Sequence, residues 1–235
     1  ASRSGLALAA RGREMGLPLA FVAAHASAEF PVDFGDSPPS LLRDVNVKSA
    51  PRELAQARVI DLSALWAGPL CAQLLHRCGA QVTTVSSMQR PDGAQFGSPD
   101  FYRQLHAGHE GLQLDFSDVS HRVRLAELLV DADVVIEASR PRGLIGLGLD
   151  RQSLTIAKPQ VWLSITAYGR TPPADQWVGF GDDIGVSAGL LGWDKSHRPA
   201  FVGDAIADPL TGVYAALAVI DAMVQGESGL LDFPM

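Results

Sequence analysis

From residue 57 onward, short β-rich runs alternate with stretches that have helical spacing. The runs lie at 57–65, 81–87, 111–116, 132–139 and 159–168. The intervening stretches, at 69–79, 99–106, 118–130 and 143–157, repeat apolar residues at the spacing of one helix face. Strands joined by single helices form a mostly parallel sheet, because each helix returns the chain to the same end of the sheet. The pattern therefore predicts an α/β fold, an open Rossmann-like sheet with helices on both faces.

In such a sheet, ligands bind outside the carboxyl ends of the strands. The segments that follow the predicted strands are therefore the candidate binding segments, namely 66–69, 86–93, 139–142 and 168–170. The first strand is not followed by the glycine pattern of dinucleotide-binding proteins, and the chain has no P-loop motif. A nicotinamide or nucleoside-triphosphate enzyme is disfavoured.

Composition excludes several other classes of protein. The chain has 235 residues, of which 47% are hydrophobic, and carries 19 basic against 26 acidic residues. A net charge of -7 without a basic cluster argues against nucleic acid as a partner. Cys71 and Cys78 have no matching Cys/His pairs, so neither a disulfide framework nor a metal site is indicated. We expect no metal, no membrane span and a cytoplasmic protein.

The first 50 residues do not share the strand and helix rhythm. Residues 4–15 have helical spacing, 11–28 superficially resemble a secretory signal, and the stretch that follows is rich in Pro, Ser and acids. We interpret 1–50 as the tail of a preceding module plus a linker, and 51–235 as the Rossmann-like domain. The chain is expected to be a piece of a longer polypeptide.

Two acids precede the small-residue apolar run GDAIADPLTGVYAAL at 203–217. Asp208 followed by Pro209 is a favourable pair for opening a helix, which by pattern alone predicts Asp208 as an N-cap. Asp204 reads as a solvated loop acid. Asp182 and Asp183 lie in the glycine-flanked GFGDDIG, where acids often only bind nearby backbone N–H groups.

An ordered set of segments resembles the family III CoA-transferases, which include formyl-CoA and carnitine CoA-transferases and the α-methylacyl-CoA racemases. The segments are VIDLSALWAGPLCAQLLHRCGAQVTTV (59–85), LQLDF (112–116), ADVVIEASRPRGLIGLGLD (132–150), LSITAYGR (163–170), WVGFGDDIGVSAGLLG (177–192) and FVGDAIADPLTGVYAALAVIDAM (201–223). Their order and spacing match the family over residues 57–223. By the same resemblance, 9–22 is similar to the end of a preceding module.

The resemblance implies an enzyme that moves CoA from an acyl-CoA to a carboxylic acid. Such transfer needs a carboxylate that forms a mixed anhydride and then an enzyme-CoA thioester. The family's D-x-x-x-G position falls on Asp208, which the resemblance makes the catalytic nucleophile. A helix N-terminus also keeps a carboxylate ionised, so the capping and nucleophilic roles are compatible.

The resemblance also implies residues that bind coenzyme A at the strand ends. Trp66 and Ala67 match the family's adenine-side segment, although core packing would equally explain Trp66. Arg140 and Arg142 could bind phosphates through forked donors, or could simply be solvated. Tyr168, Asp182 and Asp183 complete the candidate cofactor-binding set.

The chain departs from the family pattern at several positions. Gly146 stands where the family has a basic residue, Thr84 to Ser86 replace a segment that ends in an acid, and His106 to His109 replace an N-R-G-K turn. Phe180 stands where the racemases have a proton-transferring His, so transfer is preferred over racemisation. These departures reduce the number of basic residues available to bind the CoA phosphates.

Two classes of function therefore stay open. The first is an acyl-CoA:carboxylate CoA-transferase, or part of one, with acyl-CoA and carboxylic acid as substrates. The second is a non-catalytic module of the same family that serves dimerisation or partner binding; an acyl-CoA racemase or isomerase is a weaker third. The resemblance further implies an interlocked homodimer, or a complementary C-terminal chain, that supplies the missing C-terminal half of the fold.

Overall fold

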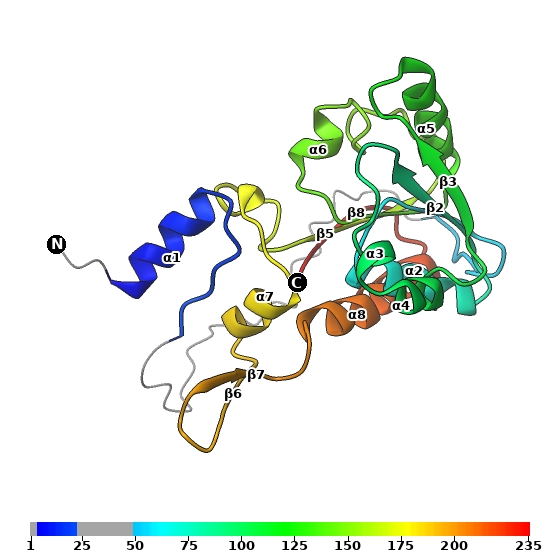
Figure 1. The fold of residues 1–235 in the computed structure, drawn as a ribbon. Helices are drawn as coiled ribbons and strands as arrows, with labels where there is room; N and C mark the ends of the chain where they lie inside the picture. Colours follow the sequence, from blue (N-terminus) through cyan, green and yellow to red (C-terminus); the bar gives the residue numbers. More distant parts are fainter. Residues whose placement is uncertain (1–3, 23–48) are drawn as a thin grey trace.

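The computed structural model describes residues 4–22 and 49–235, and its centre is a six-stranded parallel sheet (Figure 1). The strand order is β3-β2-β1-β4-β5-β8, and every neighbouring pair is parallel. The strands are β1 (Arg58–Asp61), β2 (Gln81–Ser87), β3 (Glu110–Leu114), β4 (Val134–Glu137), β5 (Val161–Thr166) and β8 (Gly229–Pro234). This is the order of doubly wound nucleotide-binding folds, in which the strand order reverses between β1 and β4. The predicted open, parallel α/β fold is confirmed.

Helices cover both faces of the sheet because the strand side chains alternate. Val59, Val134 and Leu163 point into a hydrophobic cluster with α2 (Ala67–Arg77) and α8 (Ala207–Val224). Ile60, Val135 and Trp162, their neighbours in sequence, point into a second cluster with α5 (Val119–Asp131). Continuous apolar strands are typical of a parallel sheet that is buried on both faces.

The remaining helices are short. They are α1 (Gly5–Glu14), α3 (Ala94–Gly97), α4 (Pro99–Leu105), α6 (Arg142–Ile145), η1 (Ala174–Gln176) and α7 (Gly181–Ser187). The expected helix over 143–157 is wrong, because α6 ends at Ile145 and turns follow it. Gly148 has a φ of +67°, a left-handed conformation that interrupts a helix. Its neighbour Gly146, at the end of α6, adds a second weak helix former.

An excursion between β5 and α8 leaves the sheet. It contains α7 and a hairpin of β6 (Leu191–Trp193) and β7 (Pro199–Phe201). In Figure 1, α7, this hairpin and the N-terminal segment with α1 lie together, beyond the N-terminal end of α8. The hairpin and α7 were not anticipated as separate elements, because GFGDDIG was interpreted as a turn. Residues 23–48, interpreted as a linker, lie outside the described part of the chain.

Helix α8 is the one helix among the described residues that is long and apolar enough to cross a membrane by length and composition. Its buried face, which includes Ala215, Ala216 and Val219, packs into the cluster with α2 and the sheet. Small residues on that face allow close approach to α2. Packing in the core accounts for this face of α8, while Leu210, Val213, Tyr214 and Leu217 on the same helix are exposed.

Candidate active site

Asp208 lies in the first turn of α8 and is not its N-cap. The helix begins at Ala207, and Ile206 occupies the N-cap position without a side-chain capping bond. Ala205, with a φ of +46°, turns the chain into the helix, and its carbonyl oxygen accepts a bond of 2.9 Å from the Asp208 amide. The capping interpretation was wrong because the turn is made by backbone at 205–206, earlier than the Asp-Pro pair. The carboxylate of Asp208 is free to point elsewhere.

That carboxylate lies against Gly181 and faces the backbone N–H groups of Ala67 and Gly181, both of which lower its pKa. Ala67 is the first residue of α2 and Gly181 is the first residue of α7. These amides belong to the first turns of their helices, where N–H groups have no partner within the helix. Three helix beginnings, those of α2, α7 and α8, therefore meet at one side chain.

Two glycines make this meeting sterically possible. A Cβ atom at Gly181 would overlap the Asp208 carboxylate and the Ala205 carbonyl oxygen. A Cβ atom at Gly212 would lie 2.8 Å from the Ala67 carbonyl oxygen, closer than real Cβ atoms come to backbone. Asp208 and Gly212 are four residues apart and so lie on the same face of α8. The D-x-x-x-G spacing places the carboxylate and the close helix contact side by side.

Burial raises the pKa of Asp208 above its ordinary value. The amide bonds from Ala67 and Gly181 oppose this, while the nearby charges of Asp182 and Asp183 add to it. A carboxylate with a raised pKa is a stronger base, and hence a better nucleophile, than a solvated one. The amides hold its position without abolishing that effect.

Asp182 and Asp183 belong to the first turn of α7. The Asp182 carboxylate accepts from the Ala205 amide at 3.0 Å, which connects α7 to the approach of α8. The Asp183 carboxylate accepts from the Phe180 amide at 2.7 Å, and burial raises its pKa. Both acids thus bind backbone N–H groups, as their sequence context also allowed. The structure places them beside Asp208.

Trp66 and Ala67 lie where β1 passes into α2. Trp66 packs edge to face on Phe101 of α4, with ring centroids 5.0 Å apart. The preceding residue, Leu65, has a φ of +70°, and its amide is held by the carboxylate of Asp92 at 3.0 Å. This loop therefore presents the Ala67 amide to Asp208 in a fixed position.

The two candidate phosphate-binding arginines occupy different surroundings. Arg140 lines a cavity of about 230 Å³ at the ends of β4 and β5, which extends to Phe180. Arg142 lies on the exposed surface of α6 and lines none of the cavities described here. Neither guanidinium group has a hydrogen-bond partner within 4–22 and 49–235.

Tyr168 contacts α1 and α7. Its hydroxyl lies 3.2 Å from the hydroxyl of Ser187, and the guanidinium of Arg13 lies 4.5 Å above its ring. Arg13 also donates to Ser187 at 3.0 Å and to the Leu19 carbonyl oxygen at 2.9 Å. Tyr168 therefore joins the N-terminal segment to the end of α7.

Two buried acids at the strand ends escaped the sequence analysis. Asp61 ends β1 and Glu137 ends β4, on either side of the point where the strand order reverses. Burial raises the pKa of Asp61 to about 6, and it also raises that of Glu137, although Arg170 lies 3.1 Å away. An acid that closes an apolar run, as in VID and VVIE, is the signal that could have found them.

His106 and His109 replace the basic turn of the family pattern and line another cavity, of about 460 Å³, beside β2 and β3. Burial, together with the neighbouring His106 and His76, lowers the pKa of His109 to about 4. The ring of His109 is therefore neutral at pH 7 and supplies no positive charge. Among the described residues, no three His, Cys, Asp or Glu side chains gather as a metal site requires.

The parallel sheet with its reversed strand order and its covering helices defines a Rossmann-like α/β protein. A family model for CoA-transferase family III matches residues 54–229. The chain belongs to this family.

Similar proteins carry transferase names. A succinate–glutarate CoA-transferase of Agrobacterium fabrum is 29% identical over 77% of this chain and 50% of its own length. The human succinyl-CoA:glutarate CoA-transferase is 26% identical over 74% of this chain and 42% of its own. The chain thus spans about half the length of these curated relatives, or less.

A solved structure shows the same fold. A CAIB/BAIF family protein from Brucella suis superposes with a TM-score of 0.70 and 30% identity, over 78% of this chain and 53% of that protein.

Proposed function

We propose that the protein is an acyl-CoA:carboxylate CoA-transferase in which Asp208 is the nucleophile. The observation that carries this proposal is the meeting of Asp208 with the Ala67 and Gly181 amides where α2, α7 and α8 begin. The transferase names of the relatives support the same class of reaction. Asp182, Asp183, Trp66 and Arg140 border the site in this proposal, with the CoA chain lying across the strand ends.

The reaction begins when an Asp208 oxygen attacks the thioester carbonyl of the acyl-CoA. The carbon–sulfur bond breaks, CoA leaves as a thiolate, and an aspartyl-acyl anhydride remains. The thiolate then attacks the Asp208 carbonyl carbon, which releases the donor carboxylate and leaves an aspartyl-CoA thioester. The acceptor carboxylate repeats both steps in reverse, so Asp208 returns unchanged and a new acyl-CoA departs.

The Ala67 and Gly181 amides have two roles in this scheme. In the free enzyme they hold the Asp208 carboxylate in place. When the thiolate attacks the Asp208 carbon, negative charge develops on an oxygen that already faces an N–H donor. Preorganised donors of this kind stabilise the transition state without reorganisation.

Trapping the intermediate tests the proposal. We expect the full-length protein, incubated with an acyl-CoA and then hydroxylamine, to carry a hydroxamate on Asp208 by mass spectrometry. Asp208→Asn keeps the hydrogen-bond acceptor but not the nucleophile, and should lower kcat on the order of 10³-fold or more. Asp204→Asn, at an exposed acid four residues earlier, is the matched control and should stay near wild type. A fully active Asp208→Asn enzyme would refute the assignment.

A second candidate function is a non-catalytic module of the same family. It is favoured by the loss of basic residues at Gly146 and at the 106–109 turn, and by the neutral ring of His109. Binding of CoA by calorimetry discriminates the two. A protein that binds no CoA and yields no adduct fits the module.

We further propose that 51–235 forms the family domain, that 1–50 is the tail of another module, and that a homodimer or a complementary C-terminal chain completes the fold. Exposed apolar side chains on α8, at Leu210, Val213, Tyr214 and Leu217, support such a contact. Light scattering on the full-length protein measures the oligomeric state.

A further inference from the structure

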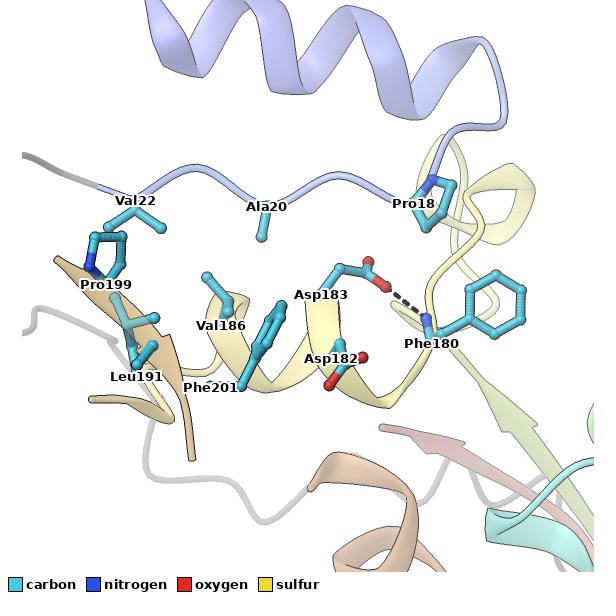
Figure 2. A pocket seen from close by; sticks show the side chains of 11 residues that line it. Pro18, Ala20, Val22, Phe180, Asp182, Asp183, Val186, Leu191, Pro199 and Phe201 are labelled. Atoms are coloured by element: carbon cyan, nitrogen blue, oxygen red, sulfur yellow. Dashed lines mark hydrogen bonds between the residues drawn. The ribbon is translucent and has the colours of Figure 1, made fainter. Parts of the chain in front are cut away.

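A cavity of about 500 Å³ lies between α7, the β6–β7 hairpin and the N-terminal segment at 18–22 (Figure 2). Its walls are mainly apolar and come from all three parts of the chain. Val22 belongs to the N-terminal segment, Val186 to α7, and Leu191 and Phe201 to the hairpin. A cavity of this size can enclose a small ligand group.

The cavity begins next to the nucleophile of the proposed transferase. Phe180 and Asp182 both line it, and Gly181 between them lies against the Asp208 carboxylate. Asp182 also accepts from the Ala205 amide, two residues before α8 begins at Ala207. The residues on either side of Gly181 therefore connect the Asp208 carboxylate to this cavity.

The charge of the lining is one-sided. Asp182 and Asp183 are its charged members, and none of the described residues that line it is basic. One carboxylate oxygen of Asp183 is buried without a hydrogen-bond partner among the described residues. The nearby Arg13 lines the adjoining cavity, where Ser187, the Leu19 carbonyl oxygen and the Tyr168 ring hold its guanidinium. A second carboxylate on an acyl group would meet two acids, while the Arg13 guanidinium, whose charge acts on Asp183, is already engaged by Ser187, the Leu19 carbonyl oxygen and the Tyr168 ring.

From this lining we infer that the cavity receives the acyl group and selects uncharged, apolar acyl groups over dicarboxylic ones. The inference rests on the proposed transferase function and narrows its substrate class. It separates this protein from relatives whose names specify succinate and glutarate. Burial of a hydrocarbon chain against the apolar walls contributes favourable binding free energy. In contrast, Asp182 and Asp183 repel a terminal carboxylate.

Competing thioesters test the selectivity. The full-length protein is assayed for transfer to propionate from hexanoyl-CoA, benzoyl-CoA, succinyl-CoA and glutaryl-CoA, and kcat/KM is compared. We expect the two neutral donors to exceed the dicarboxylic donors by about tenfold or more. Succinyl-CoA or glutaryl-CoA equal to or better than the neutral donors would overturn the selectivity while leaving the transferase intact. No transfer from any donor would overturn the transferase, and the acyl site with it.

Two variants locate the selectivity in this cavity. Val186→Phe narrows it and should lower kcat/KM for hexanoyl-CoA about tenfold relative to acetyl-CoA, whose acyl group is too short to fill it. Val123→Phe, the same change on the exposed surface of α5, is the control. It should alter kcat/KM for neither hexanoyl-CoA nor acetyl-CoA. Leu191→Lys introduces a cation at a half-buried position of the hairpin. It should raise kcat/KM for succinyl-CoA relative to that for hexanoyl-CoA.

Thermal unfolding of each variant establishes that it is folded before its rates are compared. Unchanged donor preference in both folded cavity variants would overturn the placement of the acyl group here.

Discussion

The pKa of Asp61, a single residue at the end of a strand, depends mainly on the burial of its side chain. Its side chain is fully buried at the end of β1. One carboxylate oxygen accepts from the Ser63 amide at 2.9 Å and from the Ser63 hydroxyl, and the other has no partner among the described residues. Burial is the largest cause of its raised pKa, and the bonds from Ser63 act in the opposite direction. Folding therefore extends the pH range in which Asp61 is neutral, from below about 3.8 to below about 6.

This residue predicts a pH dependence of stability. The pKa of Asp61 is about 6 in the folded protein and ordinary, near 3.8, in the unfolded chain. Between these values the folded state binds the extra proton, so the contribution of Asp61 to stability falls as the pH rises from about 4 to about 6. Asp61→Asn cannot ionise, and should be more stable than wild type above pH 6, by about 2 to 3 kcal/mol.

Urea unfolding at pH 4.5 and pH 7.5 measures the difference in the free energy of unfolding. The difference should shrink to about 1 kcal/mol at the lower pH, because it vanishes only below the unfolded pKa of 3.8. A constant difference at both values would show that Asp61 does not titrate as described.

At the scale of elements, the contact between α2 and α8 determines the geometry of the candidate site. Gly212 of α8 lies against the first turn of α2, near the Ala67 carbonyl oxygen and the Leu70 side chain. The same turn of α2 supplies the Ala67 amide to Asp208. The distance between the two helices therefore controls how closely the Ala67 amide approaches the proposed nucleophile.

Gly212→Ala should weaken both stability and activity. Its methyl group would lie 2.8 Å from the Ala67 oxygen and 2.9 Å from Leu70 Cβ, so α2 must shift. We expect a loss of about 1 to 3 kcal/mol, despite the gain of about 1 kcal/mol that Ala brings to a helix interior. Gly97→Ala in α3, where a Cβ has open space, is the matched control. Unfolding midpoints and kcat measure both effects, and a stabilised, fully active Gly212→Ala would contradict the tight contact.

At the scale of the whole molecule, the sheet is the rigid body that carries the site. The central strands β1, β4 and β5 have neighbours on both edges and helices on both faces. Every residue of β4 and β5 is buried, whereas β3 at the sheet edge is largely exposed. The site lies at the ends of the most protected strands.

Amide hydrogen exchange should follow this gradient. We expect the amides of β1, β4 and β5 to exchange only with global unfolding, and those of β3 and the β6–β7 hairpin to exchange faster through local opening. Exchange measured by mass spectrometry on peptic fragments tests this. Equal protection of β3 and β5 would contradict the order of burial.

The sequence by itself determined the α/β class, the positions of most strands and the family resemblance that singled out Asp208. It could do so because buried parallel strands are continuous apolar runs, and because a motif such as D-x-x-x-G is local. It also placed Asp182 and Asp183 near a candidate site, through the same resemblance.

Only the tertiary structure decided which groups meet. Asp208 comes between the Ala67 and Gly181 amides because α2, α7 and α8 converge, although they lie far apart in the chain. The start of α8 was misplaced because Ala205 and Ile206, which carry no capping signal, make the turn. The apolar cavity combines residues near 20, 186 and 200, and no local pattern encodes such a juxtaposition. Hydrophobic periodicity is a local property of the sequence. Hydrogen bonds and cavities between distant segments, in contrast, form only when the whole fold packs.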